Sequence, residues 1–224
     1  MKEIINKKFI IRYKERWFDT EVKSRSMARV FQSELPTSGL VIFKKQKTTI
    51  LINLESWDRS KLRPTTRNEI KKIDLKTRTY TSKKWTDTDP EYKELLVKKY
   101  EKFAKDKKIT KINQSRLEAF GENSLVTELV IEESKSYHIY IDDGLRCRLL
   151  YSWREISKHG DKIVIAGINK LHTVLDIEKI KEDEKRLYDF GGWGEKKERG
   201  IDKFKTQFGG QLMREYNYLY FPVW

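Results

Sequence analysis

The spacing of apolar side chains predicts a chain that uses both helices and strands. From Glu91 to Lys107, the apolar residues recur every three or four positions, as on one face of a helix. Ser115 to Phe120 predicts a shorter helix that ends at Gly121. A third helix is predicted from about Ala166 to Asp183, and a charge-rich one from Asp19 to Phe31.

Apolar and β-branched runs predict strands in the remaining segments. The pattern is clearest after residue 124, where two alternating runs are joined by Asp142-Asp143-Gly144, the sequence of a tight hairpin turn. Residues 40–43 and 49–54 are separated by a polar segment and predict a second hairpin, while threonine-rich 79–90 predicts a loop. The other expected strands are 9–13, 125–131, 137–141, 145–153, 187–190 and 211–224, with a turn at 36–39.

The stretch from Arg186 to Gly210 has the most distinctive order of features. A short apolar run containing Asp189 ends at Gly191-Gly192, and a charged loop follows over 194–199. Ile201, Phe204 and Phe208 then share one helical face, and Gly209-Gly210 closes that helix. The stretch predicts a strand, a loop, a short helix and a final strand.

Composition limits the classes of protein that fit. The length of 224 residues suits a single domain spanning 1–224, and no apolar run reaches the roughly 20 residues of a membrane span. The apolar run near the N-terminus is too short for a signal peptide, so we expect a cytoplasmic protein. The lone Cys147 excludes an internal disulfide and a thiolate metal cluster. No metal cofactor is expected.

The formal net charge of +14 has two interpretations. It suits an anionic partner such as tRNA, coenzyme A phosphates, a nucleotide sugar or a membrane surface contacted peripherally. It also suits solvated lysines interleaved with acidic residues. Thr65 or Thr66 with Glu69 predicts a capped helix start, and four nearby cations could hold a phosphate there: Arg63, Arg67, Lys71 and Lys72.

Three motifs together resemble the Fem-type proteins, the FemABX group. They are Y-D-F-G-G followed by G-I-D-K-F-K-T-Q-F-G-G, A-G-I-N-K-L-H at 166–172, and L-R-P-T-T-R-N-E-I at 62–70. The resemblance spans about 60–215 and is strongest over 166–210. It implies a GNAT-like α/β fold, with a central, mostly antiparallel, splayed sheet flanked by helices. The Fem proteins that build wall bridges have two such units, and this chain has room for one.

The resemblance implies acyl transfer to an amine and suggests which residues take part. Lys205, after Phe204, matches a lysine thought to offset negative charge on the reacting carbonyl. Asp189 is expected to line the cleft, and His172 stands one helical turn before Asp176, which could orient its ring. Candidate donor or substrate contacts are Phe204, Arg63, Arg67, Gly167 and Asn169. In this fold the helix after the central strands points its N-terminus at the donor pyrophosphate.

The donor and the acceptor stay open at this point. Because the chain has one unit, we expect an acyl-CoA donor and an amino group of a cell-envelope sugar or its nucleotide- or lipid-linked precursor. The glycine-rich loop Q/R-x-x-G-x-G/A of acetyl-CoA users is absent. The basic charge instead favours aminoacyl-tRNA. A different class is a non-catalytic nucleic-acid-binding module with stacking aromatics at Tyr216, Tyr218, Tyr220 and Phe221.

Overall fold

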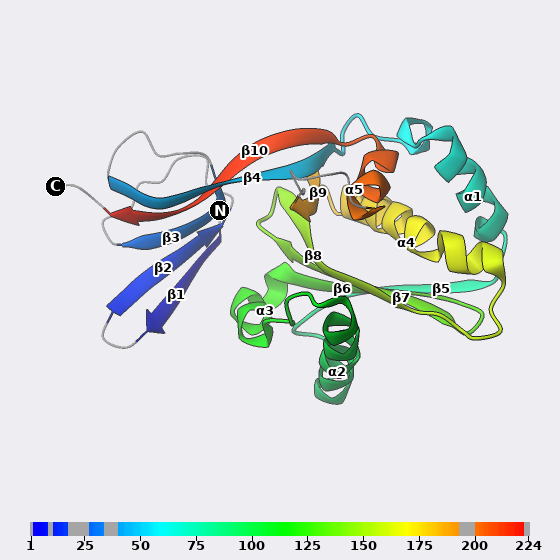
Figure 1. Cartoon of the computed structure of the whole chain (residues 1–224), viewed down its shortest axis with the longest axis horizontal. Helices are drawn as coiled ribbons and strands as arrows, with labels where there is room; N and C mark the ends of the chain where they lie inside the picture. The colour runs from blue at the N-terminus through cyan, green and yellow to red at the C-terminus, as the bar shows by residue number, and fades with distance from the viewer. Residues whose placement is uncertain (1, 9–10, 18–26, 34–39, 193–199, 222–224) are drawn as a thin grey trace.

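The structure is a computed structural model that describes residues 2–8, 11–17, 27–33, 40–192 and 200–221. One ten-stranded sheet runs through it, in the order β1-β2-β3-β10-β4-β9-β8-β7-β6-β5 (Figure 1). Only β2 with β3 and β8 with β9 pair in parallel. The strands are β1 (Lys2–Lys8), β2 (Ile11–Trp17), β3 (Ala28–Ser33), β4 (Leu40–Asn53), β5 (Arg78–Lys84), β6 (Ser124–Ile131), β7 (Ser134–Asp142), β8 (Arg146–Glu155), β9 (Leu187–Gly192) and β10 (Gln211–Phe221).

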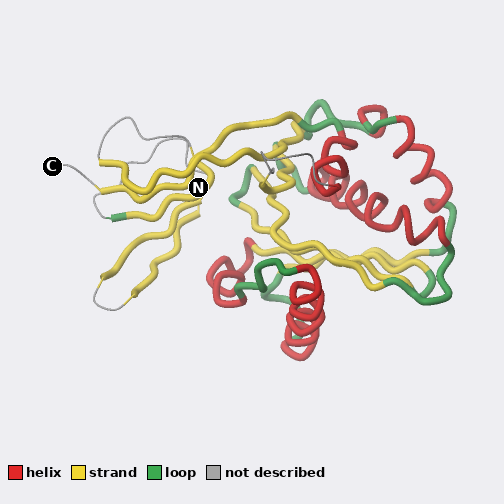
Figure 2. The backbone as a smooth tube through the Cα atoms, viewed as in Figure 1, coloured by secondary structure: helices red, strands yellow, loops and turns green. Residues whose placement is uncertain are grey.

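Helices cover both faces of the half of the sheet that contains β5 to β8 (Figure 2). On one face, α1 and α4 pack over an apolar core that includes Ile73, Leu171 and Val174. On the other, α2 and α3 cover Leu96, Leu117 and Trp153. The helices are α1 (Pro64–Asp74), α2 (Pro90–Lys107), α3 (Gln114–Phe120), α4 (Lys162–Glu182) and α5 (Gly200–Lys205), with single 3-10 turns at Arg59–Lys61, Gly121–Asn123 and Thr206–Phe208.

The sheet opens in its middle, between β8 and β9. These strands are joined through α4 and pair over three positions, from Arg146 with Leu187 to Arg148 with Asp189. Beyond that point β8 continues to Glu155 and β9 to Gly192 with no further pairing between them. The α/β class, the mostly antiparallel sheet and its splay are therefore confirmed, and the splay leaves room for a site.

Most of the expected elements around this opening are present. Helices α2 and α3 and strands β6, β7, β8, β9 and β10 lie where the apolar pattern predicted them. Gly209 has a φ of +82°, the left-handed conformation expected of a residue that closes a helix. The charged loop 194–199, the turn 36–39 and the ends of the first and last expected strands lie outside the described residues.

The hairpin expected within 40–54 is wrong, because β4 is one continuous strand. Its polar middle segment pairs with β10, with Gln46 opposite Tyr216 and Lys45 opposite Asn217. The segment has none of the Gly or Asn residues that a tight turn requires. Its backbone hydrogen bonds are satisfied by a strand more than 150 residues later in the chain, which no local pattern reveals.

Two further expectations fail for the same reason. The helix expected over 19–31 is wrong at its end, since Ala28 to Phe31 belong to β3, and Val30 packs with Tyr218 and Tyr220. Residues 18–26 lie outside the described part. The loop expected over 79–90 is strand β5 as far as Lys84, paired antiparallel with β6 along its whole length. Its threonines are β-branched and suit a strand at the sheet edge.

The starts of two helices also differ from expectation. Helix α4 begins at Lys162, about one turn earlier than expected, because Asp161 caps it and Val164 packs in the core. Helix α1 lacks the expected capping box: Arg63 is its N-cap and makes no side-chain cap bond. The Thr66 hydroxyl donates instead to Gln207 Oε1 at 2.7 Å. Among the described helices, none is both long and apolar enough to cross a bilayer.

Candidate functional site

The opening between β8 and β9 holds a cavity of about 390 Å³, whose walls come from both sides of the sheet. Tyr100 on α2 and the nearby Ile109 line it from one side, and Asn169 on α4 lines it from the other. Helix α5 contributes Phe204 and Lys205. A ligand in this cavity could therefore contact residues that lie on both faces of the sheet. The remaining lining residues lie on β8 and β9: Arg148, Leu149, Leu150, Ser152, Phe190, Gly191 and Gly192.

Lys205 places its ammonium at the end of β9. The side chain is buried, and its Nζ donates to the carbonyl oxygen of Gly191 at 3.3 Å and to that of Gly192. An ammonium has three N–H donors, so one is left for a ligand in the cavity. Burial lowers the pKa of Lys205 to about 8, although the carboxylate of Asp202 partly opposes this shift. Lys205 therefore remains mostly charged at neutral pH.

Asp189 is fully buried and saturated with hydrogen bonds. Its Oδ2 accepts from Arg146 Nε at 2.9 Å and from Arg148 Nη1 at 2.7 Å, and its Oδ1 accepts from the Gly191 amide at 2.8 Å and from the Thr49 hydroxyl. Burial alone would raise the pKa of Asp189, but the two guanidinium groups outweigh it and lower the pKa to about 2. This arrangement suits an anchor for Arg148 better than a proton acceptor.

Arg148 is a charged residue of the cavity wall that the sequence analysis did not predict. Arg148 as a whole is 6% exposed and its guanidinium is held by Asp189, so the cavity has a second cation beside Lys205. Burial lowers the pKa of Arg148 from its usual value, yet an arginine so close to a carboxylate stays charged. A signal was present: Arg146 and Arg148 stand two apart in an apolar strand, which places two charges on one face.

His172 does not reach the cavity. It is fully buried between α4 and the sheet, where its Nδ1 lies 2.8 Å from Ser136 Oγ and its Nε2 lies 3.0 Å from Thr127 Oγ1. Burial lowers the pKa of His172 to about 3, which keeps the ring neutral. Its ring stacks on that of His138 at 4.0 Å. The expected partner Asp176 is nearby, with its Oδ1 3.5 Å from His172 Nε2.

The other candidate residues fall into two groups. Asn169 and Phe204 line the cavity. Gly167 does not: a Cβ there would lie 2.7 Å from Ile73 Cδ1, so this glycine allows α1 and α4 to pack closely. Arg67 donates to the backbone oxygens of Ser60 and Leu62, at 3.4 and 3.3 Å. Arg63 is an exposed residue before α1, and Lys71 and Lys72 lie farther along that helix, on its exposed surface.

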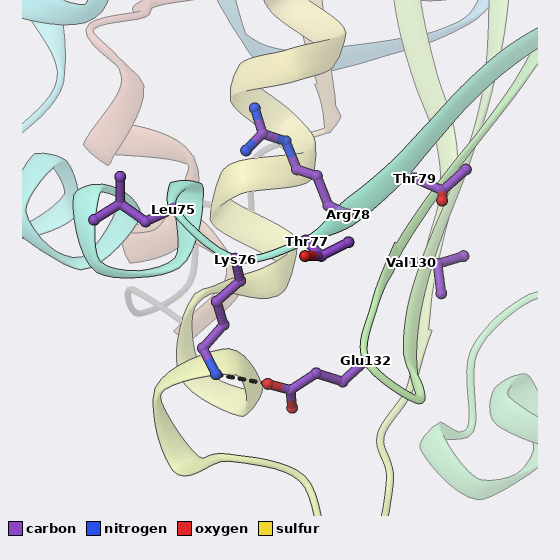
Figure 3. Close-up of a pocket in the computed structure, with 7 residues that line it drawn as sticks. All are labelled: Leu75, Lys76, Thr77, Arg78, Thr79, Val130 and Glu132. Atoms are coloured by element: carbon purple, nitrogen blue, oxygen red, sulfur yellow. Dashed lines mark hydrogen bonds and ion pairs between the residues drawn. The ribbon is translucent and has the colours of Figure 1, made fainter.

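The N-terminus of α4 is not open to a phosphate. The Asp161 carboxylate accepts from the Ile163 amide at 2.8 Å and pairs with Lys76 at 2.9 Å. Lys76 also pairs with Glu132, as Figure 3 shows. Both residues line a shallow hollow of about 540 Å³ formed by the segment after α1 and by parts of β5 and β6. The side chains of Asp161 and Lys76 thus already occupy the helix end at which the resemblance led us to expect a pyrophosphate. The hollow itself lacks converging polar groups and is bordered by the exposed Leu75.

The aromatic residues of the last strand do not form a stacking surface. Tyr218 and Tyr220 are buried against Ala28 and Val30 of β3. The Tyr216 ring is partly buried and has Lys44 Nζ 4.6 Å from its centre. A flat nucleic-acid base could not stack on the two buried rings without unfolding this part of the sheet.

No protein-family model matches this sequence, and no curated protein matches it. Similar solved structures exist. The C-terminal domain of a protein assigned as a lysylphosphatidylglycerol synthetase from Agrobacterium fabrum aligns with a TM-score of 0.58 and 11% identity, over 86% of this chain and 67% of that one. FemX aligns with a TM-score of 0.59 and 10% identity, over 77% of this chain and 61% of FemX.

A third similar structure is L-PGS from Bacillus licheniformis, with a TM-score of 0.56, 13% identity, and coverage of 88% of this chain and 68% of that one. This chain thus spans about two thirds of the length of each neighbour. The chain therefore shares its fold with FemX and with the two lysylphosphatidylglycerol-synthetase-type structures. The motifs between 166 and 210 resemble those of Fem-type proteins, and the similarity to FemX confirms the fold that this resemblance implied.

Proposed function

We propose that this protein is an acyltransferase that moves an acyl or aminoacyl group onto an amine in the cavity between β8 and β9. The observation that supports this most directly is the placement of Lys205 and Arg148 on the wall of a cavity that is otherwise largely apolar. Phe190, Phe204 and Leu150 provide apolar walls for an acyl chain. A few polar groups converging in an apolar cavity are typical of a ligand site.

The reaction requires stabilisation of an oxyanion. The amine lone pair attacks the acyl carbon, and the electron pair of the C=O bond moves onto its oxygen. The remaining N–H of Lys205 can donate to that oxygen, and the charge of Arg148 lies close by. Collapse of the adduct reforms the C=O bond and expels the oxygen or sulfur of the donor. This leaving atom takes up the proton that the amine nitrogen loses, and an amide remains.

The two cations also help to explain how the acceptor amine becomes neutral. A free primary amine with a pKa near ~10 is almost fully protonated at pH 7, and converting it to the neutral form costs about 4 kcal/mol. Nearby positive charges disfavour the ammonium form of the acceptor. Lys205 and Arg148 therefore favour the reactive free amine, and Asp189, with a pKa of about 2, need not act as a base.

Direct attack suits the cavity better than a covalent acyl-enzyme. Ser152 is the hydroxyl-bearing side chain of the cavity wall other than Tyr100. Within the described residues, no histidine or carboxylate is hydrogen-bonded to Ser152 Oγ. Without a base, a serine hydroxyl is a weak nucleophile at neutral pH.

We favour an aminoacyl ester carried on tRNA as the donor, although the single unit of the sequence led us to expect acyl-CoA. The end of α4 that would bind a pyrophosphate already holds Asp161 and Lys76. The net charge of +14 suits a long polyanion. The acceptor we propose is an amino group of a cell-envelope sugar or its nucleotide- or lipid-linked precursor, as the resemblance implies.

Transfer of label from two donors tests the proposal. The protein is incubated with glucosamine and either bulk tRNA charged with radiolabelled amino acids or radiolabelled acetyl-CoA. We expect amide product from charged tRNA, together with tRNA binding that weakens as salt rises. Product from acetyl-CoA alone, with thermal stabilisation by coenzyme A, would return the preference to acyl-CoA. No product, no tRNA binding and no stabilisation would reject the acyltransferase proposal.

A further inference from the structure

A buried chain of hydrogen bonds leads from the cavity into the core. Asn169 lines the cavity, and its Oδ1 lies 2.9 Å from Nε2 of His138, a fully buried residue on β7. On the other side of the ring, His138 Nδ1 lies 2.6 Å from Asp176 Oδ2. Asp176 also accepts from the hydroxyls of Tyr140, at 2.5 Å, and Tyr80, at 2.9 Å. Nε2 of His138 thus faces the side-chain oxygen of Asn169, and the Asp176 carboxylate lies against the other ring nitrogen.

A second donor reaches the same amide oxygen. Ser136 Oγ donates to Asn169 Oδ1 at 3.1 Å, and the same hydroxyl lies 2.8 Å from His172 Nδ1. Since His172 is neutral, one consistent arrangement has its Nδ1 donating to Ser136 and its Nε2 accepting from the Thr127 hydroxyl. Ser136 and His138 together therefore occupy both lone pairs of Asn169 Oδ1.

The same cluster could suggest a metal site, since ligand atoms of His138, His172 and Asp176 lie within 4.8 Å of one another. All four ring nitrogens, however, already lie within hydrogen-bond distance of oxygen atoms of this chain. An ion would have to displace these partners. The cluster is better explained as a network that orients the one member at the cavity wall, Asn169.

We propose that His138 is a positioning residue: with Ser136 it holds the carbonyl oxygen of the Asn169 side chain toward the core, so that the amide N–H₂ group is presented to the cavity. There the group donates to the carbonyl oxygen or an adjacent ester oxygen of the acyl donor. This inference rests on the proposed function. It makes Asn169 a neutral donor beside the cations Lys205 and Arg148. It also makes the cavity selective for a ligand that offers an acceptor at this position.

Kinetics of four variants test the role of His138. Asn169→Ala and His138→Phe should each lower kcat/KM for the acyl donor about tenfold, the loss expected for one neutral hydrogen bond. His138→Gln, whose amide can replace the Nε2 donor, should recover most of that loss. Because His138 acts through Asn169, the double variant that combines Asn169→Ala with His138→Phe should be no slower than Asn169→Ala alone. Additive losses in the double variant would overturn the inference.

Thr88→Val is the matched control, since it removes a buried hydroxyl that donates to the Lys84 carbonyl oxygen, outside the network. It should lower stability but leave kcat/KM for the donor near the wild-type value. If His138→Phe does not fold, Ser136→Ala replaces it, because that variant removes the other donor to Asn169 Oδ1. An unchanged kcat/KM in folded Ser136→Ala, with Asn169→Ala also unchanged, would reject the role.

A spectroscopic measurement separates this inference from the proposed function. The ¹³Cγ resonance of Asn169 in the ligand-free protein, assigned by its loss in Asn169→Ala, reports hydrogen bonding to the amide oxygen. It should move in Ser136→Ala and His138→Phe and stay near its wild-type position in Thr88→Val. If the resonance moves but the wild-type protein transfers no acyl group, His138 and Ser136 do orient the Asn169 amide, but the hydrogen bond from Asn169 to an acyl donor is rejected. If it does not move, His138 does not position Asn169.

Discussion

Arg148 on β8 and Asp189 on β9 face each other at the last paired position before the sheet opens, with Arg148 Nη1 2.7 Å from Asp189 Oδ2. The ion pair closes the narrow end of the splay and presents Arg148 to the cavity. Burying a carboxylate with two guanidinium groups is costly unless its lone pairs are satisfied, and here they are. Stability and the site therefore depend on the same contact.

We predict that Asp189→Asn loses about 3–5 kcal/mol of unfolding free energy at pH 7, because buried Arg148 loses its counter-ion and Arg146 retains Glu215 but loses Asp189. Denaturation by urea measures the loss. The matched control is Asp183→Asn, which breaks the surface pair with Lys179 at 2.7 Å and should change stability by less than about 1 kcal/mol. Equal effects of the two variants would show that the Asp189 cluster contributes no more than a surface pair.

The pKa of Asp189, about 2 against an ordinary 3.8, also predicts an acid transition. A depressed carboxyl pKa contributes stability that is present above the unfolded-state value and is lost as pH falls through the folded-state value. The wild-type protein should therefore lose this contribution between about pH 4 and 2, whereas Asp189→Asn should lack it. The measurement is the urea midpoint of both proteins at several pH values below 5. Parallel curves of midpoint against pH for the wild type and Asp189→Asn would contradict the prediction.

Lys205→Ala should retain the fold but lower kcat for acyl transfer roughly 10²–10³-fold, as for the loss of one oxyanion donor. Lys203→Ala is the control, because Lys203 is an exposed lysine on the same helix that does not line the cavity. Similar turnover of the two variants would remove Lys205 from the proposed reaction.

The pH profile tests the charge state in which Lys205 acts. Its pKa is about 8, so a role as a cation predicts that kcat falls as pH rises above 8. Lys205→Arg keeps a positive charge at all these pH values and should shift the fall to higher pH. If kcat instead rises through pH 8 in the wild-type protein but not in Lys205→Arg, the neutral amine of Lys205 is the active form, and a role as a base replaces the proposed one.

His172 predicts a second pH effect on stability. Its pKa is lowered to about 3, from an ordinary 6.5, so the unfolded chain takes up a proton below about pH 6.5 that the folded protein does not. A buried neutral histidine therefore costs stability as pH falls from about 6.5 to 3. Between pH 7 and 5, the unfolding free energy of His172→Gln, measured with urea, should depend less steeply on pH than that of the wild type. The difference in slope corresponds to at most about one proton bound by the unfolded chain. An unchanged slope would mean that His172 is not the titrating group.

Gly209→Ala should destabilise the protein by about 1–3 kcal/mol. Gly209 has a φ of +82°, and an added Cβ would lie 2.9 Å from Lys61 Cβ and 3.0 Å from the Lys61 carbonyl oxygen. Gly200→Ala is the matched control, because a Cβ there meets nothing within 4 Å. Thermal unfolding of the two variants should differ, and equal melting temperatures would show that the turn after Phe208 adapts without strain.

Much of the fold could be predicted because its elements satisfy themselves locally. Helix α2 carries its own cap at Asp89 and an apolar stripe, and the hairpin between β7 and β8 has Asp143 and Gly144 at its turn. The misassigned segments lack such signals. The middle of β4 and most of β5 are polar or charged, and β3 is short. Each of these strands is held in the sheet by pairing with a strand that lies far away in the chain.

The amino-acid sequence by itself determined the α/β class, the order of elements after residue 90, and the segment that holds Lys205, because periodicity, caps and glycines act over a few residues. The tertiary structure decided which polar groups meet. It joined Arg148 to Asp189 across 41 positions of the chain and Asn169 to His138 across 31, and it buried His172 away from the cavity. Burial and the separation of β8 from β9 set the charge and access of these groups, and both depend on contacts between distant strands that no local pattern encodes.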